Sequence, residues 1–303
     1  MSDGLQVSRY AFKLVVPGAW IVFRMSMRRR NALQDLYVSM AITSAVFLIA
    51  HRVAARVSMV SSSDSGSRLV AGWMLPASIG VLWATSILSA VFGSISAPAR
   101  SEFEPVLGAL LTRLKPWHVC AGRLIAGLWV PISATLLSCA LMLCAAMYRG
   151  AGASDLRATA TSVVVVRIAV VHLLIIVYTI EVGALSQFAG LNRTPGRSFP
   201  RGLVTGLGLI VLSTITIWLI NPAVVAATRP ERWINIALLV NPTTGIASIF
   251  DVDLIRASFL YSHLQASDYL FAYPGAFAMM LVSAAVSVAA IIAAGAQLRR
   301  AYR

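Results

Sequence analysis

Long apolar segments alternate with short polar and basic segments along most of the chain. An α-helix needs about 20 apolar residues to cross the hydrocarbon core of a bilayer. The apolar segments reach this length, and they lack the strict two-residue alternation of the strands in outer-membrane barrels. We therefore predict an all-α membrane protein with six transmembrane helices. The predicted spans are residues 34–56, 70–97, 119–147, 161–189, 202–220 and 274–297.

The segment before the first span, residues 1–33, is expected to form an interfacial amphipathic helix on the cytoplasmic side. Its apolar part is short, is interrupted by a Pro-Gly pair and precedes a cluster of four arginines. A signal peptide carries its charge before the apolar part, so that alternative fits less well. Trp20 and Phe23 would anchor the helix at the membrane surface. Residues 34–303 then form the six-span transmembrane domain.

A charged segment, residues 98–118, separates the second and third predicted spans. Glu102 and Glu104 stand at the start of a predicted short helix. Arg113 and Lys115 stand at its end, and this order of charges suits the helix dipole. Leucines and a valine recur between them at helical spacing, which gives the helix one apolar side. The helix either lies at the cytoplasmic surface of the membrane or docks a soluble partner.

Composition supports lipid as the solvent of the chain. Hydrophobic residues make up 58% of the chain and charged residues 12%, and the mean hydropathy is +0.80. The net charge is +14. Because the basic residues lie between spans, we assign them to the positive-inside rule and to anionic lipid, and exclude nucleic acid as a partner. With the amino terminus in the cytoplasm, about twice as many lysines and arginines fall inside as outside, so both termini are expected there.

The segment 221–272 is predicted to be an outer loop with short interfacial or re-entrant helices. Residues 233–250 are apolar enough to suggest a seventh span. However, Asn241 and Pro242 fall inside this run, and a proline breaks a spanning helix. A seventh span would also place the arginine-rich carboxyl terminus outside. Asp251, at the end of the run, is expected to be solvated.

Three ionisable residues, Arg167, His172 and Glu181, fall inside the fourth predicted span. Such groups are costly at membrane depth and are often functional. Arg167 and Glu181 would lie about 21 Å apart along one helix, too far to pair directly. A proton relay is one hypothesis. The other is that Arg167 extends to the membrane surface, that Glu181 pairs with a base near the cytoplasm and that His172 is a hydrogen-bonded packing residue.

Small residues open the fifth predicted span. Gly202 and Gly206 form a small-xxx-small pattern, which permits two helices to approach closely. This face either packs within the subunit or contacts a second subunit.

Catalytic, cofactor and metal sites are not evident in the sequence. Cys120, Cys139 and Cys144 lack metal-ligand spacing and are expected to pack as small apolar residues. The phosphate-binding pattern GxxxxGK followed by Ser or Thr does not occur. We therefore expect a chain that is not an enzyme and that carries no cofactor of its own.

Two stretches resemble ABC exporter permeases of the type-two class. The first, EFEPVLGALLTRLKPWHVCAGRLIAG, is similar to the region after the second span in that family, although Arg123 replaces the usual lysine and Pro105 is not typical. Its matching positions are Glu104, Gly108, Leu110, Leu111, Pro116, Trp117, Gly122, Arg123 and Leu124. The second, PERWINIALLVNPTTGIASI, is similar to the family's last outer loop. Its matching positions are Pro230, Trp233, Asn241 and Pro242.

The resemblance implies a permease that pairs with a second permease, as a homodimer or a heterodimer, in a bacterial inner membrane. Two separate ATPase subunits would bind ATP and Mg. The segment 98–118 would be the coupling helix, with Glu102, Glu104, Arg113 and Lys115 at the ATPase. The complex would export an amphiphilic or hydrophobic substrate between the two permeases, near spans two and five.

The sequence is also compatible with two other functions. An ion-coupled secondary transporter would use His172 and Glu181 of the fourth span. A non-transporting membrane scaffold or a lipid-modifying enzyme is the other alternative, and it would need convergent polar residues on several spans.

Overall fold

The chain folds as a bundle of α-helices in the computed structural model. The structure describes residues 19, 22–23, 37–38, 41–43, 45, 74–97, 114–150, 155–191, 198–226, 230–252 and 273–301. Every regular element among these residues is helical. The elements are α4 (Leu75–Ser96), α6 (Pro116–Gly127), α7 (Trp129–Gly150), α8 (Asp155–Gly190), α9 (Ser198–Ala226), α10 (Pro230–Val240), α11 (Pro242–Ile249) and α13 (Ala276–Ala301).

In the part of the chain that the structure describes, five helices are long and apolar enough to cross a membrane. These candidate spans are Leu75–Ser96, Trp129–Met147, Ser162–Gly190, Ser198–Thr216 and Ala276–Arg300. They correspond in order to the second through sixth predicted spans, so the prediction of a multi-pass helical protein is confirmed. The first predicted span and the N-terminal interfacial helix lie almost wholly outside the described residues. The first span, 34–56, and with it the total of six, therefore stays a prediction.

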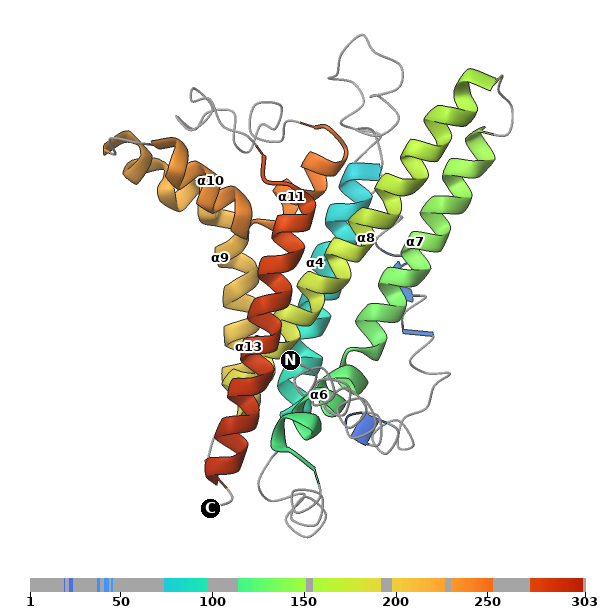
Figure 1. The fold of residues 1–303 in the computed structure, drawn as a ribbon. Coiled ribbons are helices and arrows are strands. Elements are labelled where there is room, and N and C mark those ends of the chain that lie inside the picture. Colours follow the sequence, from blue (N-terminus) through green and yellow to red (C-terminus); the bar gives the residue numbers. More distant parts are fainter. Residues whose placement is uncertain are drawn as a thin grey trace, which may run out of the picture.

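Helix α8 forms the centre of the bundle. It contacts α4, α7, α9, α11 and α13 and crosses the ribbon view obliquely (Figure 1). Its buried side chains include Ile168, Leu174 and Ile175, which belong to one apolar core shared with the neighbouring helices. Because other helices surround α8 on several sides, polar groups on different faces of α8 each meet a different neighbour.

The two ends of the bundle carry different short helices (Figure 1). One end holds α6, where Gly295 of α13 packs against the backbone of Trp117. At the same end, Gly190 of α8 lies close to Ala97 and Ser198, which bring the end of α4 and the start of α9 together. The opposite end holds α10 and α11. We refer to these as the α6 end and the α10–α11 end.

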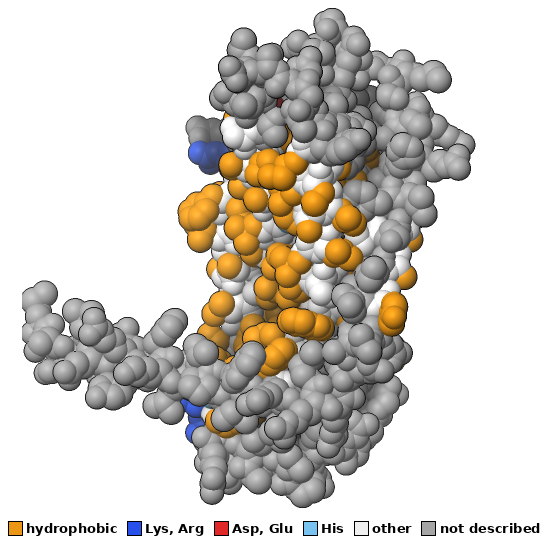
Figure 2. Space-filling view, turned by 90° about the vertical axis from the view of Figure 1, so that its right-hand side faces the viewer, with side chains coloured by type: hydrophobic (Ala, Val, Ile, Leu, Met, Phe, Trp, Pro, Cys, Tyr) orange, Lys and Arg blue, Asp and Glu red, His pale blue; other side chains and the backbone are white. Residues whose placement is uncertain are grey.

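Apolar side chains cover the surface between the two ends. Figure 2 shows them as a band across one face of the bundle, and the lysine or arginine side chains visible there lie beyond the band. Large exposed apolar residues occur on every long helix, for example Leu136, Leu173, Val204 and Val288. A water-soluble protein rarely exposes so large a continuous apolar surface, so the band indicates contact with lipid.

The third predicted span, 119–147, is interrupted, which corrects the prediction of one continuous helix. The structure has α6 up to Gly127, a turn at Leu128, and then α7. Pro131 explains the interruption, because its ring nitrogen cannot donate to the carbonyl of Gly127 and its ring clashes with that carbonyl. The candidate membrane span accordingly begins at Trp129, and α6 precedes it as a separate short helix.

Candidate functional site

Polar side chains along α8 define the candidate site. Arg167, His172, Glu181 and Gln187 all lie on this helix, and each has a hydrogen-bond partner on another part of the chain. Because α8 is central, these contacts connect it to four different neighbours. The site is thus a series of separate polar contacts along one helix.

Arg167 pairs with Asp251, which directly follows the C-cap of α11. The end of α11 forms a Schellman motif, in which Val252 N–H bonds to the Ala247 carbonyl at 2.9 Å and Asp251 N–H to the Ser248 carbonyl at 3.1 Å. Asp251 has φ 56° there, in the position that glycine usually takes. The carboxylate is 70% exposed, yet it is not simply solvated as the sequence suggested, because it meets the guanidinium of α8.

His172 is held by two hydrogen bonds. Its Nδ1 lies 2.8 Å from the carbonyl oxygen of Ile168, and because a carbonyl only accepts, Nδ1 carries the proton. In a neutral ring, Nε2 then accepts from the Ser138 hydroxyl of α7 at 3.2 Å. The ring is 2% exposed and both nitrogens have partners. This is the arrangement expected of a hydrogen-bonded packing residue.

Glu181 is half-buried and faces α13, where Ser283 forms a hydrogen bond to its carboxyl group. His172 and Glu181 are nine residues apart, so they point to opposite sides of α8 and lie about 13 Å apart along its axis. Their partners agree with this, since Ser138 belongs to α7 and Ser283 to α13. The structure therefore does not bring these two residues together as a relay pair.

Asn241 joins the last two short helices to α9. It interrupts the run 233–250 between α10 and α11, and its Oδ1 caps α11 by accepting from Thr243 N–H at 3.0 Å. Its Nδ2 donates to the Thr214 carbonyl of α9 at 3.3 Å. Pro242 occupies the first turn of α11, where its missing N–H costs nothing. Trp233 lies on α10 and is half-exposed.

Gly202 and Gly206 lie where α9 meets α4 and α8. A Cβ on Gly202 would lie 2.5 Å from the Ser186 carbonyl oxygen, and one on Gly206 would lie 2.6 Å from Ala90 Cβ. A third contact of this kind joins α4 to α8, where a Cβ on Gly93 would lie 2.5 Å from the Gly183 carbonyl oxygen. These glycines therefore fit helices of the same subunit against one another.

Several buried polar residues that join helices were not among the residues predicted from the sequence. Ser89 of α4 donates to the Thr179 carbonyl at 2.5 Å, and Gln187 donates to the Cys120 carbonyl at 3.0 Å. The signal was present, because Ser and Thr recur on α4 at helical spacing. These buried positions are Ser78, Thr85, Ser86, Ser89, Ser94 and Ser96.

The proposed ATPase-contacting residues are described only in part. Lys115 immediately precedes α6 in an extended conformation and is exposed, whereas Glu102, Glu104 and Arg113 lie outside the described residues. His118, one turn into α6, is 4% exposed, and neither ring nitrogen has a hydrogen-bond partner among the described residues. Burial, and secondly the charge of Lys115, lower the pKa of His118.

Metal ligands are not clustered in the part of the chain that the structure describes, where no group of three or more His, Cys, Asp or Glu side chains could hold an ion. The three cysteines are free thiols. Cys120 is buried, Cys139 is half-buried and Cys144 is exposed.

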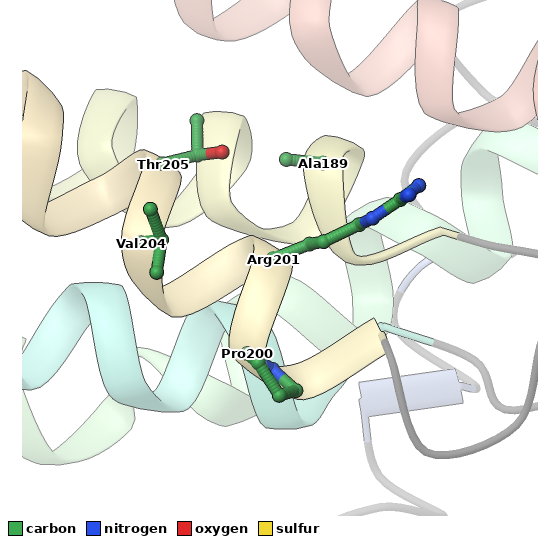
Figure 3. A pocket seen from close by; sticks show the side chains of 5 residues that line it. All are labelled: Ala189, Pro200, Arg201, Val204 and Thr205. Carbon is green, nitrogen blue, oxygen red and sulfur yellow. The ribbon is translucent and has the colours of Figure 1, made fainter.

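An open cleft lies between the end of α8 and the start of α9 (Figure 3). Its volume is about 320 Å³. It is lined by Pro200, Arg201, Val204 and Thr205 of α9 and by Ala189 of α8. Comparisons of the chain with protein-family models, curated proteins and solved structures give no match.

Proposed function

We propose that the chain is the membrane-spanning permease subunit of an ATP-driven exporter of the ABC type. The observation that carries this proposal is the pair of stretches that resemble type-two permeases. The second half of one stretch folds as α6, and the other stretch folds as α10 and α11. They belong to opposite ends of a multi-pass helical bundle, as expected if ATPase subunits bind on one side and a short outer helix pair lies on the other.

The distribution of charge supports an orientation with the α6 end in the cytoplasm of a bacterial inner membrane. Described side chains at that end include five basic residues, and no acidic side chain is described there. The basic residues are Lys115, Arg123, Arg201, Arg299 and Arg300. Positive charge concentrates on the cytoplasmic side of multi-pass proteins. Both termini would then be cytoplasmic, and α10 and α11 would lie at the outer surface as interfacial or re-entrant helices.

In this proposal two separate ATPase subunits bind ATP and Mg, and the segment 98–118 transmits their motion to the permease. Two permeases, identical or different, would enclose the transport path. Helices α4 and α9 are neighbours and both expose large apolar side chains, for example Ile87 and Val211. A path beside such surfaces suits an amphiphilic or hydrophobic substrate, which lipid-like contacts would accommodate.

A second candidate is an ion-coupled transporter, which Glu181 favours because a carboxyl group at membrane depth is costly unless it has a role. It has less support than the exporter, since His172 faces the other side of α8. The two candidates differ in energy source. Transport that survives ATP depletion and collapses with an uncoupler would select the ion-coupled transporter.

The test is co-purification of the tagged chain in mild detergent, followed by an ATP hydrolysis assay. We expect a soluble-type ATPase to co-purify and to show vanadate-sensitive turnover. The variant E102K/E104K should lose the ATPase while the chain still inserts. The control E231K reverses the charge of an acidic residue of α10 and should still co-purify with the ATPase. A chain that purifies alone in several detergents would overturn the assignment. Unchanged ATPase binding and transport in E102K/E104K would overturn the coupling role of segment 98–118.

A further inference from the structure

The cleft at the start of α9 combines three kinds of surface (Figure 3). Arg201 supplies a cation, Thr205 supplies a hydroxyl group, and Ala189, Pro200 and Val204 supply apolar walls. Arg201 and Thr205 are exposed, so both can meet a ligand from outside the bundle. A cation and a hydroxyl beside an open apolar cleft suit a ligand that has an anionic head and an apolar tail.

The spacing of residues on α9 extends this cleft along the helix. Arg201, Thr205 and Gly208 follow one another at intervals of four and three, so they share one face. A Cβ on Gly208 would have no heavy atom within 4 Å, so the helix surface is bare at this point. Val204 and Val211 are 69% and 55% exposed beside it. Together they form an apolar track that leads from the cleft toward the middle of the span.

Negative charge is absent from the part of the sequence that forms the cleft. No Asp or Glu occurs between Glu181 and Glu231, so the end of α8 and the whole of α9 place no carboxylate beside Arg201. The first N–H groups of α9 add partial positive charge at the same place, because a helix dipole is positive at its amino end. The charge at the cleft therefore complements an anionic headgroup.

We propose that this cleft binds an anionic phospholipid, with its phosphate at Arg201 and Thr205 and one acyl chain along α9 past Gly208. A guanidinium donates strong charge-assisted hydrogen bonds to phosphate oxygens, and the threonine hydroxyl can donate one more. Free phosphate would use only the polar part of the site and would leave the apolar track empty. This inference rests on the membrane-spanning character of the bundle and is independent of the proposed export activity.

The test uses the purified full-length chain in detergent, titrated with phosphatidylglycerol and followed by native mass spectrometry. Phosphatidylcholine with the same acyl chains serves as the comparison lipid. We expect saturable binding of phosphatidylglycerol and much weaker binding of phosphatidylcholine. Arg201→Gln should weaken phosphatidylglycerol binding about five-fold, which corresponds to the loss of one basic contact to an anionic headgroup. Arg201→Lys keeps the charge and should bind nearly as well as the unaltered chain.

Two further variants separate the cleft from general surface charge. Gly208→Leu should weaken binding by filling the apolar track, and the space around Gly208 allows the change without displacing protein atoms. The double variant Arg299→Gln and Arg300→Gln removes two charges from the same end of the bundle and should leave binding unchanged. Equal binding of the two lipids, unaltered binding by Arg201→Gln, or complete displacement of lipid by inorganic phosphate would overturn the proposal.

Discussion

The α6 end and the α10–α11 end of the bundle hold their helices together by different means. At the α6 end, glycines bring backbones into contact, as where Gly93 of α4 meets Gly183 of α8, in addition to the hydrogen bond from Gln187 to the Cys120 carbonyl. At the α10–α11 end, the connections run through side chains. Asn241 reaches α9, Asp251 reaches α8, and Gly245 of α11 packs against the side chains of Leu174 and Met279. The first kind of contact leaves no room for even one added methyl group. The second kind consists of contacts through side chains, polar and apolar, which can rotate individually.

This difference predicts a rigid junction at one end and an adjustable one at the other. Close-packed interiors resist changes in volume, because neighbouring atoms have nowhere to move. A single hydrogen bond contributes only about 1 kcal/mol net, so polar contacts between helices can reorganise at modest cost. If the bundle changes state during transport, we expect α4, α8 and α9 to stay together at the α6 end. The rearrangement would then occur at α10 and α11.

Gly93→Ala should produce the largest effect, because the new methyl group would meet the backbone of Gly183, which cannot rotate away. We expect a loss of about 3 kcal/mol, the upper part of the range for overpacking. The measurement is the apparent melting temperature of the chain in mild detergent. Gly208→Ala is the matched control, since it adds the same methyl group in open space on α9. Equal melting temperatures for the two variants would show that the contact between Gly93 and Gly183 is not a rigid junction.

Asn241→Ala should destabilise the α10–α11 end by about 2 kcal/mol, through loss of the α11 cap and of the bond to the Thr214 carbonyl. We expect faster proteolysis in residues 230–252, with little change at the α6 end. Asn241→Asp separates the two roles, because it keeps a capping oxygen and removes the Nδ2 donor. Its effect should be intermediate. If Asn241→Asp behaves like Asn241→Ala, the link to α9 carries the stability and the cap does not.

Local features of the fold could be predicted from sequence, whereas the partners of the polar residues could not. Apolar length predicted the described spans, and Pro242 predicted the interruption before α11, because both effects act within a few residues. The interruption at Leu128 was missed, since Pro131 lies inside a long apolar run. The pairing of His172 with Ser138, and of Glu181 with Ser283, depends on which helices lie beside α8. That order is fixed by packing of the whole bundle.

His118 should make the stability of the α6 end depend on pH. Its folded-state pKa is lowered, so the folded chain resists a proton that the unfolded chain accepts. Stability is then fully present above the unfolded pKa of about 6.5 and decreases as the pH falls toward the lowered pKa, by at most about 1.4 kcal/mol per pH unit. Melting temperatures between neutral and mildly acidic pH would measure this. His118→Leu should flatten the dependence, and an unchanged dependence would assign it to other groups.

The ion pair between Arg167 and Asp251 should have the smallest effect, because the carboxylate is 70% exposed and solvent weakens such pairs. Asp251→Asn removes the charge and tolerates the left-handed backbone, so we expect a loss of less than about 1 kcal/mol. Asp251→Gly also removes the charge but favours φ 56°, and should recover much of that loss. Melting temperatures of the two variants therefore separate the pair from the backbone. If Asp251→Gly is the less stable variant, the Asp251 side chain contributes more to holding α11 than its charge alone, and the α10–α11 end is less adjustable than its exposed contacts suggest.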